Sequence, residues 1–412
     1  MNKIEELIEK LCPDGVEYKT LDELGNFLSG LTGKAKNDFK DGNANFITYM
    51  NVYKNPNINL YDREKVKIYP NEKQNKLEYC DVIFTGSSET QDECAISSVV
   101  TQKPQGDYYL NSFCFIWRVE DKRIFEPNFL KHLFRSESLR KQLIKTASGV
   151  TRFNVSKIKM AKIEVPIPPL EVQQEIVKIL DNFTELTTEL TTELTARCKQ
   201  YEFYRDKLLT FDTSIEELSL SDIYEFKYGD GNTIPENKGQ FPVYGSNGWV
   251  GTYYDKFNCE DAPVIGHIGA YAGIVNFAKG KCYVTYNGVI CKHQNQNVNQ
   301  KFAYYLLKNQ NFLKHQKGPQ PFISYELLKN TIVKVPPLEI QERIVDVLDN
   351  FDTICSDLGI GLPAEIDARQ KQYEYYREKL LTFKTKSATI FTDRQTDRQT
   401  DRQTDRQTDR AN

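Results

Sequence analysis

The sequence predicts an α+β fold in which two mixed α/β domains, related by an approximate two-fold repeat, are separated by long antiparallel helical spacers of coiled-coil type. The first observation behind this prediction is a duplication: residues 168–183 read PPLEVQQEIVKILDNF and residues 336–351 read PPLEIQERIVDVLDNF. Each copy is followed by a second repeated block, RCKQYEFYRDKLLTF at 197–211 and RQKQYEYYREKLLTF at 369–383. Near-identity over both blocks indicates that the chain duplicates a half-protein, namely a variable domain followed by a helix.

The apolar periodicity of the first copy is the second observation. Pro168 and Pro169 cannot donate ladder hydrogen bonds but are tolerated in the first turn of a helix, so they end an extended segment and open a helix. Apolar residues then recur at three- and four-residue steps: Ile176, Leu180, Phe183, Leu186, Leu190, Leu194, Tyr201, Tyr204 and Leu208. Such a helix would span about 60 Å if unbroken, and the second copy is the expected partner for its stripe. Gly359, Gly361 and Pro363 predict a break in the second spacer.

These patterns divide the chain into six segments. We predict an N-terminal helix (1–16), a first variable domain (17–167), a central helical spacer (168–211), a second variable domain (212–335), a C-terminal helical spacer (336–383) and a disordered tail (384–412). From Thr392 the tail repeats the unit TDRQ, which has no apolar side chain to bury. Because a bare tetranucleotide repeat in the DNA encodes this unit in every frame, the tail suggests a phase-variable gene.

Short strands followed by a helix are expected in each variable domain. β-branched and aromatic residues predict strands in the first domain at 45–52, 81–84 and 112–119, and an amphipathic helix at 128–146. In the second domain they predict strands near Val243 and at 263–267, 273–277, 282–286 and 289–292, and a helix at 302–314. A Gly-containing loop follows each helix, at 149–154 and at 318–323. The shared order of parts supports the duplication.

The charge distribution follows the repeats. The whole chain has a formal net charge of −3. Residues 17–164 hold 23 Lys and Arg against 19 Asp and Glu, a net +4, and residues 224–335 hold 12 against 7, a net +5. Residues 165–223 hold 5 against 12, a net −7, and residues 336–383 hold 5 against 10, a net −5. The variable segments are therefore basic and the spacers acidic, which favours a nucleic-acid partner for the variable segments.

The motifs of the common catalytic classes are missing. There is no phosphate-binding GxxxxGK[ST] and no dinucleotide-binding GxGxxG. Nine cysteines, with no CxxC pair and no grouping with the four histidines, argue against a disulfide framework and against a zinc site. Pro13, Asp14, Glu17 and Lys19 imitate a nuclease signature, but they are compressed into a single turn. No metal site is therefore expected, and the missing motifs agree with a non-catalytic chain. No run is apolar enough to span a membrane, so we expect the chain to be cytoplasmic.

With catalytic motifs missing, the polar and Gly-rich loops of both variable domains are the candidate recognition surface. Asn and Gln can read adenine through two hydrogen bonds, Arg and Lys can read guanine, and Ser and Thr suit phosphates or either base. The candidate DNA-binding residues of the first domain are Lys34, Lys36, Ser87, Ser88, Thr90, Gln91, Arg152 and Asn154. Those of the second domain are Tyr244, Ser246, Asn247, Trp249, His267 and Gln320. For His267, in a glycine-flanked apolar run, a structural hydrogen bond or a DNA contact is expected in preference to catalysis.

Together, PPLE-x-Q, LDNF, the TTEL spacer, KQYE-[FY]-YR-[DE]-KLLTF, YGSNG and QPFIS resemble the specificity subunit of type I restriction-modification systems, from Val16 to Phe383. The resemblance implies two target-recognition domains that each read one half of a split sequence in double-stranded DNA. It implies two methyltransferase (modification) subunits and restriction (ATP-dependent translocase and endonuclease) subunits as partners. S-adenosylmethionine and ATP with Mg²⁺ then belong to those partners, and no cofactor belongs to this chain. The candidate docking residues lie in the repeated blocks: Glu171, Gln173, Glu339, Gln341, Tyr201, Tyr204, Arg205, Tyr373, Tyr376 and Arg377.

Two other classes of protein stay open from the residues alone. A duplicated coiled-coil scaffold could carry two β-rich protein-binding domains without binding DNA. Basic charge of both variable domains on one common side would favour DNA, and scatter over opposite faces would favour the scaffold. A single-chain restriction enzyme would need a nuclease or methylase domain, which these 412 residues do not contain.

Overall fold

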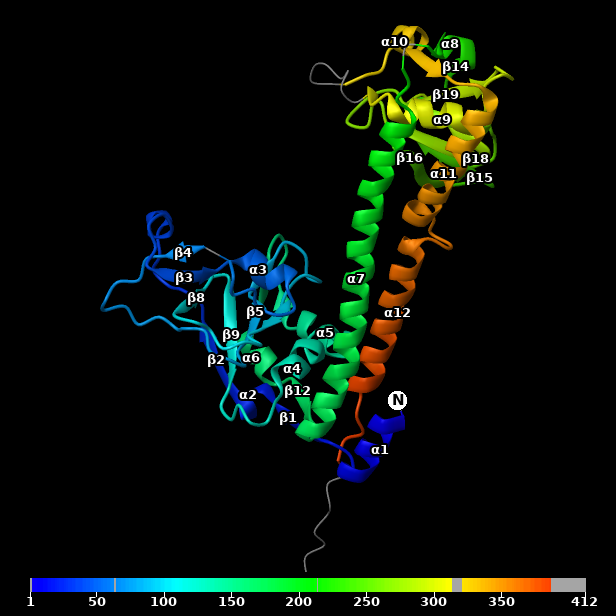
Figure 1. Ribbon diagram of the computed structural model, residues 1–412. Helices are drawn as coiled ribbons and strands as arrows, with labels where there is room; N and C mark the ends of the chain where they lie inside the picture. The colour runs from blue at the N-terminus through cyan, green and yellow to red at the C-terminus, as the bar shows by residue number, and fades with distance from the viewer. Residues whose placement is uncertain (1, 63, 213, 313–320, 387–412) are drawn as a thin grey trace, which may run out of the picture. The chain divides into compact units, whose positions relative to one another are not determined.

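The chain folds into two compact units, each built around one variable domain. The structure is a computed structural model, and it describes residues 2–62, 64–212, 214–312 and 321–386. Unit 1 comprises Met1–Thr187 and Arg369–Asn412, and unit 2 comprises Thr188–Ala368 (Figure 1). Each unit therefore takes part of its helical framework from each of the two repeats.

Unit 1 contains a four-stranded antiparallel sheet in the order β2-β9-β5-β7, with smaller sheets β4-β3-β8, β10-β11-β6 and β1-β12 around it. Its strands are β1 (Glu17–Thr20), β2 (Gly25–Ser29), β3 (Ala44–Ile47), β4 (Lys65–Val66), β5 (Val82–Thr85), β6 (Ser87–Ser88), β7 (Ser97–Val99), β8 (Tyr108–Leu110), β9 (Cys114–Val119), β10 (Ala147–Ser148), β11 (Phe153–Val155) and β12 (Glu164–Ile167). Its helices before the spacer are α1 (Asn2–Leu11), α2 (Leu21–Leu24), η1 (Lys36–Phe39), α3 (Tyr49–Lys54), α4 (Pro127–Leu133), α5 (Glu137–Ile144) and α6 (Lys157–Ala161).

The strands β5 and β9 divide their side chains between two cores. Phe84 and Trp117 belong to one core, together with Phe134 at the C-terminal end of α4. The rings of Phe84 and Phe134 pack edge to face, with their centres 5.2 Å apart. The alternate residues Ile83 and Ile116 belong to a second core on the other face. This two-sided burial explains why these strands read as nearly continuous apolar runs.

Unit 2 contains a six-stranded sheet in the order β14-β19-β17-β18-β15-β16 and a two-stranded sheet β13-β20. Its elements are β13 (Glu216–Ser219), α8 (Leu220–Ile223), β14 (Tyr224–Tyr228), β15 (Phe241–Gly245), β16 (Gly248–Tyr254), β17 (Cys259–Gly266), β18 (Val275–Val284), β19 (Gly288–His293), α9 (Gln300–Asn309), α10 (Tyr325–Asn330) and β20 (Ile332–Val335). Ile265 faces the core that includes α9, and its neighbour Val264 faces a second core.

The two units begin and end on the same plan. In unit 1 the entering strand β1 pairs antiparallel with the leaving strand β12, and in unit 2 β13 pairs with β20 in the same way. Each entering strand runs into a one-turn helix that starts with a capping box, made by Thr20 and Glu23 in unit 1 and by Ser219 and Asp222 in unit 2. Each leaving strand runs into a Pro-Pro pair and then a long helix.

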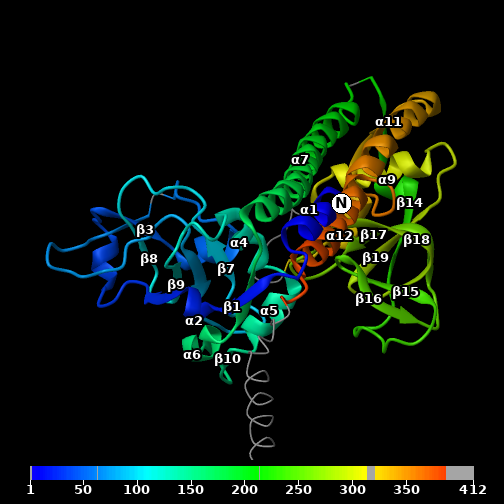
Figure 2. The ribbon, with the colours of Figure 1, turned by 90° about the horizontal axis from the view of Figure 1, so that it is seen from below.

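The long helices are α7 (Leu170–Leu208), α11 (Leu338–Ser356) and α12 (Leu362–Leu381). In unit 1 the first half of α7 lies alongside the C-terminal part of α12, where the rings of Phe183 and Tyr376 stack at 5.4 Å (Figures 1 and 2). In unit 2 the last part of α7 lies against α11, where Phe351 and Tyr204 stack at 5.7 Å. Each unit thus pairs the Pro-Pro block of one repeat with the Tyr-rich block of the other.

The predicted break in the second spacer is confirmed. The helix α11 ends at Ser356 and α12 begins at Leu362. Gly361 lies so close to the end of α11 that a Cβ atom there would be 2.4 Å from the carbonyl oxygen of Thr353. Only glycine fits this turn without moving the backbone.

Other expectations about the elements need correction. The strand predicted at 45–52 ends at Ile47, because the Thr48 side chain accepts from the N–H of Asn51 and starts α3. The helix predicted at 128–146 is two helices, since Ser136 caps the second one. The strands predicted at 273–277 and 282–286 are one strand, β18. The helix predicted at 302–314 runs from Gln300 to Asn309, and the tail from 387 lies outside the described residues.

A buried glutamine joins each variable domain to its long helix. Gln173 accepts from the N–H of Glu126 at 2.8 Å and donates to the carbonyl oxygens of Ile124 at 2.9 Å and Pro168 at 2.7 Å. Gln341 repeats this pattern: it accepts from the N–H of Asn299 at 2.7 Å and donates to Asn297 at 3.3 Å and Pro336 at 2.7 Å. We call each set a glutamine clamp.

Removing one clamp should destabilise the unit that contains it. Gln173→Leu keeps the volume but leaves three backbone groups without their partner, which costs about 2–4 kcal/mol and lowers the Tm of that unit by roughly 5–15 °C. Differential scanning calorimetry measures the effect. The neighbouring Gln174 is exposed, so Gln174→Leu is the control, and equal Tm values for the two variants would contradict the clamp.

Candidate nucleic-acid interface

Two candidate stretches of the first domain, far apart in sequence, meet in one small sheet. The strand β11 pairs antiparallel with β6, placing Phe153 opposite Ser88 and Asn154 opposite Ser87. Ser87, Ser88 and Arg152 line a pocket of about 340 Å³. The other residues that line this pocket are Tyr49, Met50, Tyr53, Glu89, Glu93 and Phe113.

The side chains of this pocket are held by hydrogen bonds to one another. Arg152 Nη2 donates to Ser87 Oγ at 3.1 Å, and the guanidinium lies 4.9 Å from the centre of the Phe113 ring. Glu93 accepts from three hydroxyls: Tyr53 at 2.6 Å, Thr90 at 2.8 Å and Ser88 at 3.2 Å. The hydrogen bond from Tyr53 is the largest cause that lowers the pKa of Glu93, followed by those from Thr90 and Ser88.

The sequence did not predict Glu93, Tyr53 and Phe113 as residues of this pocket. Tyr53 lies on α3 and Phe113 lies just before β9, so their approach to Glu93 and Arg152 depends on contacts across the domain. No local spacing signals such contacts.

The remaining candidates of the first domain differ in exposure and in hydrogen bonding. Lys34 has a side chain only 4% exposed, pairs with Glu72 and donates to the carbonyl oxygen of Lys67 at 2.6 Å. It is therefore engaged inside the domain. Lys36 is exposed on η1. Gln91 makes long hydrogen bonds of 3.4 and 3.5 Å to the carbonyl oxygens of Ile144 and Ala147.

In the second domain the candidate loop is a hairpin turn. Ser246 and Asn247 connect β15 to β16, where Gly245 pairs with Gly248. Asn247 is exposed, and the Trp249 ring is 55% exposed and meets Tyr253 edge on at 6.0 Å. The hairpin therefore presents an amide and an indole to solvent.

His267 is buried in an aromatic group. Its Nδ1 lies 3.0 Å from the carbonyl oxygen of Ile323, and its ring centre lies 4.6 Å from Tyr228 and 5.5 Å from Tyr286. The first of the two roles expected from sequence, a structural hydrogen bond, is thus present. Gln320 lies outside the described residues.

The docking candidates on the long helices divide into buried and exposed groups. Gln173 and Gln341 are fully engaged in the glutamine clamps and have no polar atom left for a partner, while Tyr201 is buried against α11. Glu171, Glu339 and Tyr204 are exposed. The candidates Arg205, Tyr373, Tyr376 and Arg377 are partly buried.

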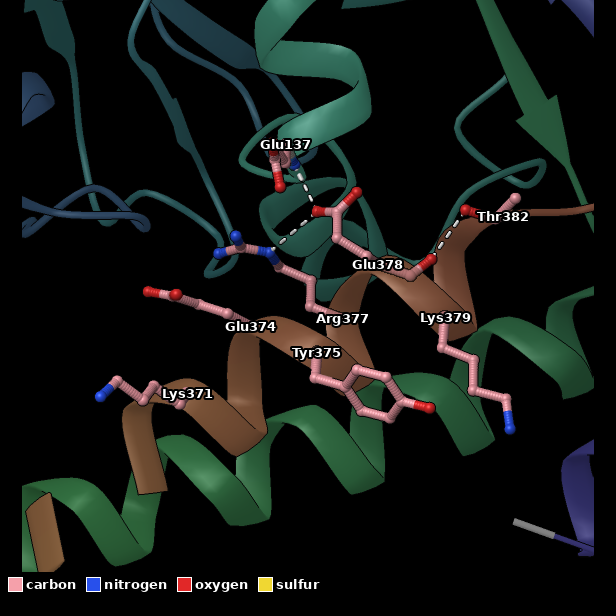
Figure 3. Close-up of a pocket in the computed structure, with 8 residues that line it drawn as sticks. All are labelled: Glu137, Lys371, Glu374, Tyr375, Arg377, Glu378, Lys379 and Thr382. Carbon is pink, nitrogen blue, oxygen red and sulfur yellow. Dashed lines mark hydrogen bonds and ion pairs between the residues drawn. The ribbon is translucent and has the colours of Figure 1, made fainter. Parts of the chain in front are cut away.

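A groove occurs at the same place on the Tyr-rich block of each unit. In unit 1 a groove of about 1020 Å³ lies between the start of α5 and the exposed side of α12, lined by Arg377, Glu378 and Thr382 (Figure 3). The Glu378 carboxylate accepts from the N–H groups of Glu137 and Ser138 and so caps α5. In unit 2 the counterparts Arg205, Asp206 and Thr210 line a groove of about 510 Å³.

Groups of metal ligands and membrane-spanning helices are not found in the described part of the chain. Over residues 2–62, 64–212, 214–312 and 321–386, no three His, Cys, Asp or Glu side chains gather as metal ligands would. None of the helices in these ranges combines the length and apolarity needed to cross a bilayer. Two domains carried on one repeated framework, each with a basic segment and a cluster of polar loop side chains, are the arrangement of a bipartite DNA-recognition protein.

Comparison with known proteins identifies the family to which the chain belongs. The family model of the type I restriction modification DNA specificity domain matches twice, at residues 13–200 and 214–368. The chain therefore belongs to the family of type I restriction-modification specificity subunits. It is the DNA specificity subunit of such a system, with two target-recognition domains, and this family is non-catalytic.

Individual relatives agree with this assignment. A type I specificity-subunit homologue of Haemophilus influenzae is 29% identical over 402 residues, which cover 91% of this chain and 98% of the relative. The EcoR124I/EcoR124II specificity subunit of Escherichia coli is 34% identical over 266 residues, covering 56% of this chain and 65% of the relative. The crystal structure of the S subunit from M. genitalium superposes with a TM-score of 0.51 at 16% identity, covering 89% of this chain and 96% of that one. A structure from a study of type I complex assembly gives 0.59 at 18% identity, covering 89% and 97%.

The helix contacts of unit 1 include a buried histidine. His132 Nε2 lies 2.7 Å from Asp181 Oδ1 on α7, and His132 Nδ1 lies 3.1 Å from the Tyr373 hydroxyl on α12. Burial is the largest effect and lowers the pKa of His132 below its ordinary value of 6.5, although the hydrogen bond to Asp181 acts in the opposite direction. In unit 2 the equivalent contact is made by Tyr305, whose hydroxyl donates to Asp349 at 2.7 Å.

We expect unit 1 to lose stability as the pH falls below about 6.5. Because the pKa of His132 is lower in the folded than in the unfolded state, the unfolded state binds the proton more readily below pH 6.5. The stabilising effect is complete above that pH and declines towards the folded pKa. Calorimetry across this range should show a smaller loss of Tm in His132→Tyr, which copies Tyr305. The reciprocal Tyr305→His should add pH dependence to unit 2, and an unchanged slope in His132→Tyr would refute the assignment.

Proposed function

We propose that this chain reads a split DNA sequence with its two variable domains and docks one methyltransferase subunit beside each of them through the long helices. The domain boundaries we propose are 17–167 and 212–335, with the spacers between and after them. The observation that carries the docking proposal is the repeated groove, at Arg377, Glu378 and Thr382 in unit 1 and at Arg205, Asp206 and Thr210 in unit 2. Two equivalent sites suit two copies of one subunit.

Exposed aromatic side chains at equivalent positions support this docking role. Tyr375 is 63% exposed on α12, and its counterpart Phe203 is 61% exposed on α7. Large exposed aromatic rings are enriched in protein interfaces. The spacers are also acidic, which disfavours contact with DNA phosphates and leaves their surfaces for protein partners.

The chemistry of the complex then belongs to the partner subunits. S-adenosylmethionine serves the methyltransferase subunits, and ATP with Mg²⁺ serves the restriction subunits, which bind the same assembly in the cytoplasm. This chain supplies the sequence information. Its contacts with DNA come from the loop clusters around Ser87 and Arg152 in the first domain and around Asn247 and Trp249 in the second.

Exchange of one domain tests whether each variable domain recognises its own half of the target sequence independently. Replacing residues 17–164 by the same segment of another specificity subunit should change one half of the methylated sequence and leave the other half intact, because the clamps fix each domain to its own helix. Methylome sequencing of the host measures this. An altered second half, or a host with no split methylated sequence at all, would refute the proposed function.

A second prediction concerns the TTEL repeats of α7, whose number we expect to determine the distance between the two half-sites. Deleting Thr187–Leu190 removes one four-residue unit, which shortens α7 by about 6 Å and rotates it by about 40°. One DNA base pair advances 3.4 Å and turns by roughly 35°. We expect the unread gap to shorten by one base pair while both half-sites keep their sequences, as methylome sequencing would show.

A two-residue deletion is the matched control for this helix. Removing Thr187 and Thr188 alone rotates the rest of α7 by about 200°, which turns its apolar stripe away from its partner and should abolish methylation. An unchanged gap after the four-residue deletion would show that α7 does not set the spacing.

A further inference from the structure

The arginines of the first domain differ in what holds their guanidinium groups. Arg118 pairs with Asp81 and Glu78, and Arg123 pairs with Asp121. Arg135 and Arg140 are mostly buried and donate to backbone carbonyl oxygens, those of Ser97 and Ala95 among them. Each of these four side chains already has acceptors inside the domain.

Arg152 is the exception among the described arginines of residues 17–167. Within the described residues it makes no ion pair, and its one hydrogen bond there uses Nη2 alone, to Ser87 Oγ at 3.1 Å. Its guanidinium carbon lies over the ring of Phe113, 4.9 Å from the ring centre, and Phe113 is itself 52% exposed. The ring contact and one hydrogen bond restrict the position of the guanidinium and leave Nη1 and the second hydrogen of Nη2 for a ligand.

The charges around Arg152 indicate what kind of ligand it takes. Glu89 and Glu93 line the same pocket of about 340 Å³. Two carboxylates repel a DNA phosphate, so this pocket is a poor phosphate site in spite of its arginine. A base edge that offers both acceptors and a donor suits it better. The major-groove edge of a G·C pair suits this pocket, since guanine presents two adjacent acceptors, O6 and N7, to the arginine fork and cytosine presents an amino group to a carboxylate, whereas adenine has an amino group beside its N7.

We propose that Arg152 reads a guanine in the half-site of the first target-recognition domain, with the carboxylate of Glu89 accepting from the paired cytosine. This inference rests on the proposed function, because it assumes that the domain lies on DNA. Arg152 is then a specificity-determining residue, and Phe113 and Ser87 are positioning residues that orient it. The second domain has no equivalent, because the sequence contains no arginine between Arg205 and Arg343.

The position of Arg152 on the fold suits this role. It follows the tip of the β10–β11 hairpin, where Val150 is almost fully exposed. Gly149 has a φ of 157°, and a Cβ atom there would lie 2.0 Å from the carbonyl oxygen of Arg152. The turn is therefore tight, and a two-stranded ribbon of this kind is narrow enough to enter the major groove.

Methylome sequencing of hosts that carry the full complex with variant chains tests the proposal. Arg152→Gln should make one G·C position of the first half-site degenerate, with discrimination there reduced about 10-fold or more, and should leave the second half-site unchanged. Arg152→Lys keeps the charge but loses the fork, so it should relax the same position. Arg123→Gln, an exposed arginine of the same domain, is the matched control and should leave the whole sequence unchanged.

A binding experiment with modified DNA keeps the proposal testable if Arg152→Gln abolishes methylation. The wild-type complex is titrated with duplexes in which each guanine of the first half-site is replaced in turn by 7-deazaguanine, which lacks the N7 acceptor. One replacement should weaken binding about 10-fold in the wild type and should have no further effect in Arg152→Gln.

Three results would overturn the inference. They are a first half-site without a G·C pair, an unchanged methylated sequence in both Arg152 variants, and equal sensitivity of wild type and Arg152→Gln to every 7-deazaguanine. Each is distinct from failure of the proposed function, in which the wild-type host shows no split methylated sequence that depends on this chain.

Discussion

Both units depend on the antiparallel contact between the Pro-Pro block of one repeat and the Tyr-rich block of the other. Phe183 stacks on Tyr376 in unit 1, and Phe351 stacks on Tyr204 in unit 2. Because the two rings of each stack come from different repeats, neither repeat can bury its helical stripe by itself. Each repeat therefore needs a second copy to bury its apolar stripe, and the duplication supplies that copy within one chain.

The glutamine clamps explain how two dissimilar domains use the same framework. Each clamp contacts the domain only through backbone atoms: the N–H of Glu126 and the carbonyl of Ile124 in unit 1, and the N–H of Asn299 and the carbonyl of Asn297 in unit 2. Backbone atoms are present whatever the side chains are. The domains can thus differ in sequence, and in the sheets they build, while their attachment to the helices stays the same.

The sequence predicted the long helices well because their apolar period and the Pro and Gly residues at their ends are local signals. The break at Gly359–Pro363 is one example, and the continuous helix from Leu170 to Leu208 is another. Local propensity failed at residues 45–52, where the side chain of Thr48 caps a helix inside an apolar run.

The candidate pocket was predictable only in part, since its parts lie far apart in the chain. Ser87, Ser88 and Arg152 were found by residue type, whereas Glu93, Tyr53 and Phe113 became visible only with the tertiary contacts. The helix pattern also gave no sign that Gln173, next to the exposed Gln174, is buried. Burial of a polar side chain follows from the backbone groups that approach it, and these come from another element.

A common plan does not oblige the two domains to recognise bases by the same chemistry. The first domain holds an arginine fork on an aromatic ring beside carboxylates, which suits a pattern of acceptors and a donor. The second presents Asn247 and Trp249 at a hairpin and no arginine, so amide hydrogen bonds and ring contacts are what it can offer. Lysine cannot replace the fork, because its ammonium is a point charge without planar geometry. The asymmetry of the two surfaces therefore favours a split target whose two halves differ in sequence, although the framework that carries them is a repeat.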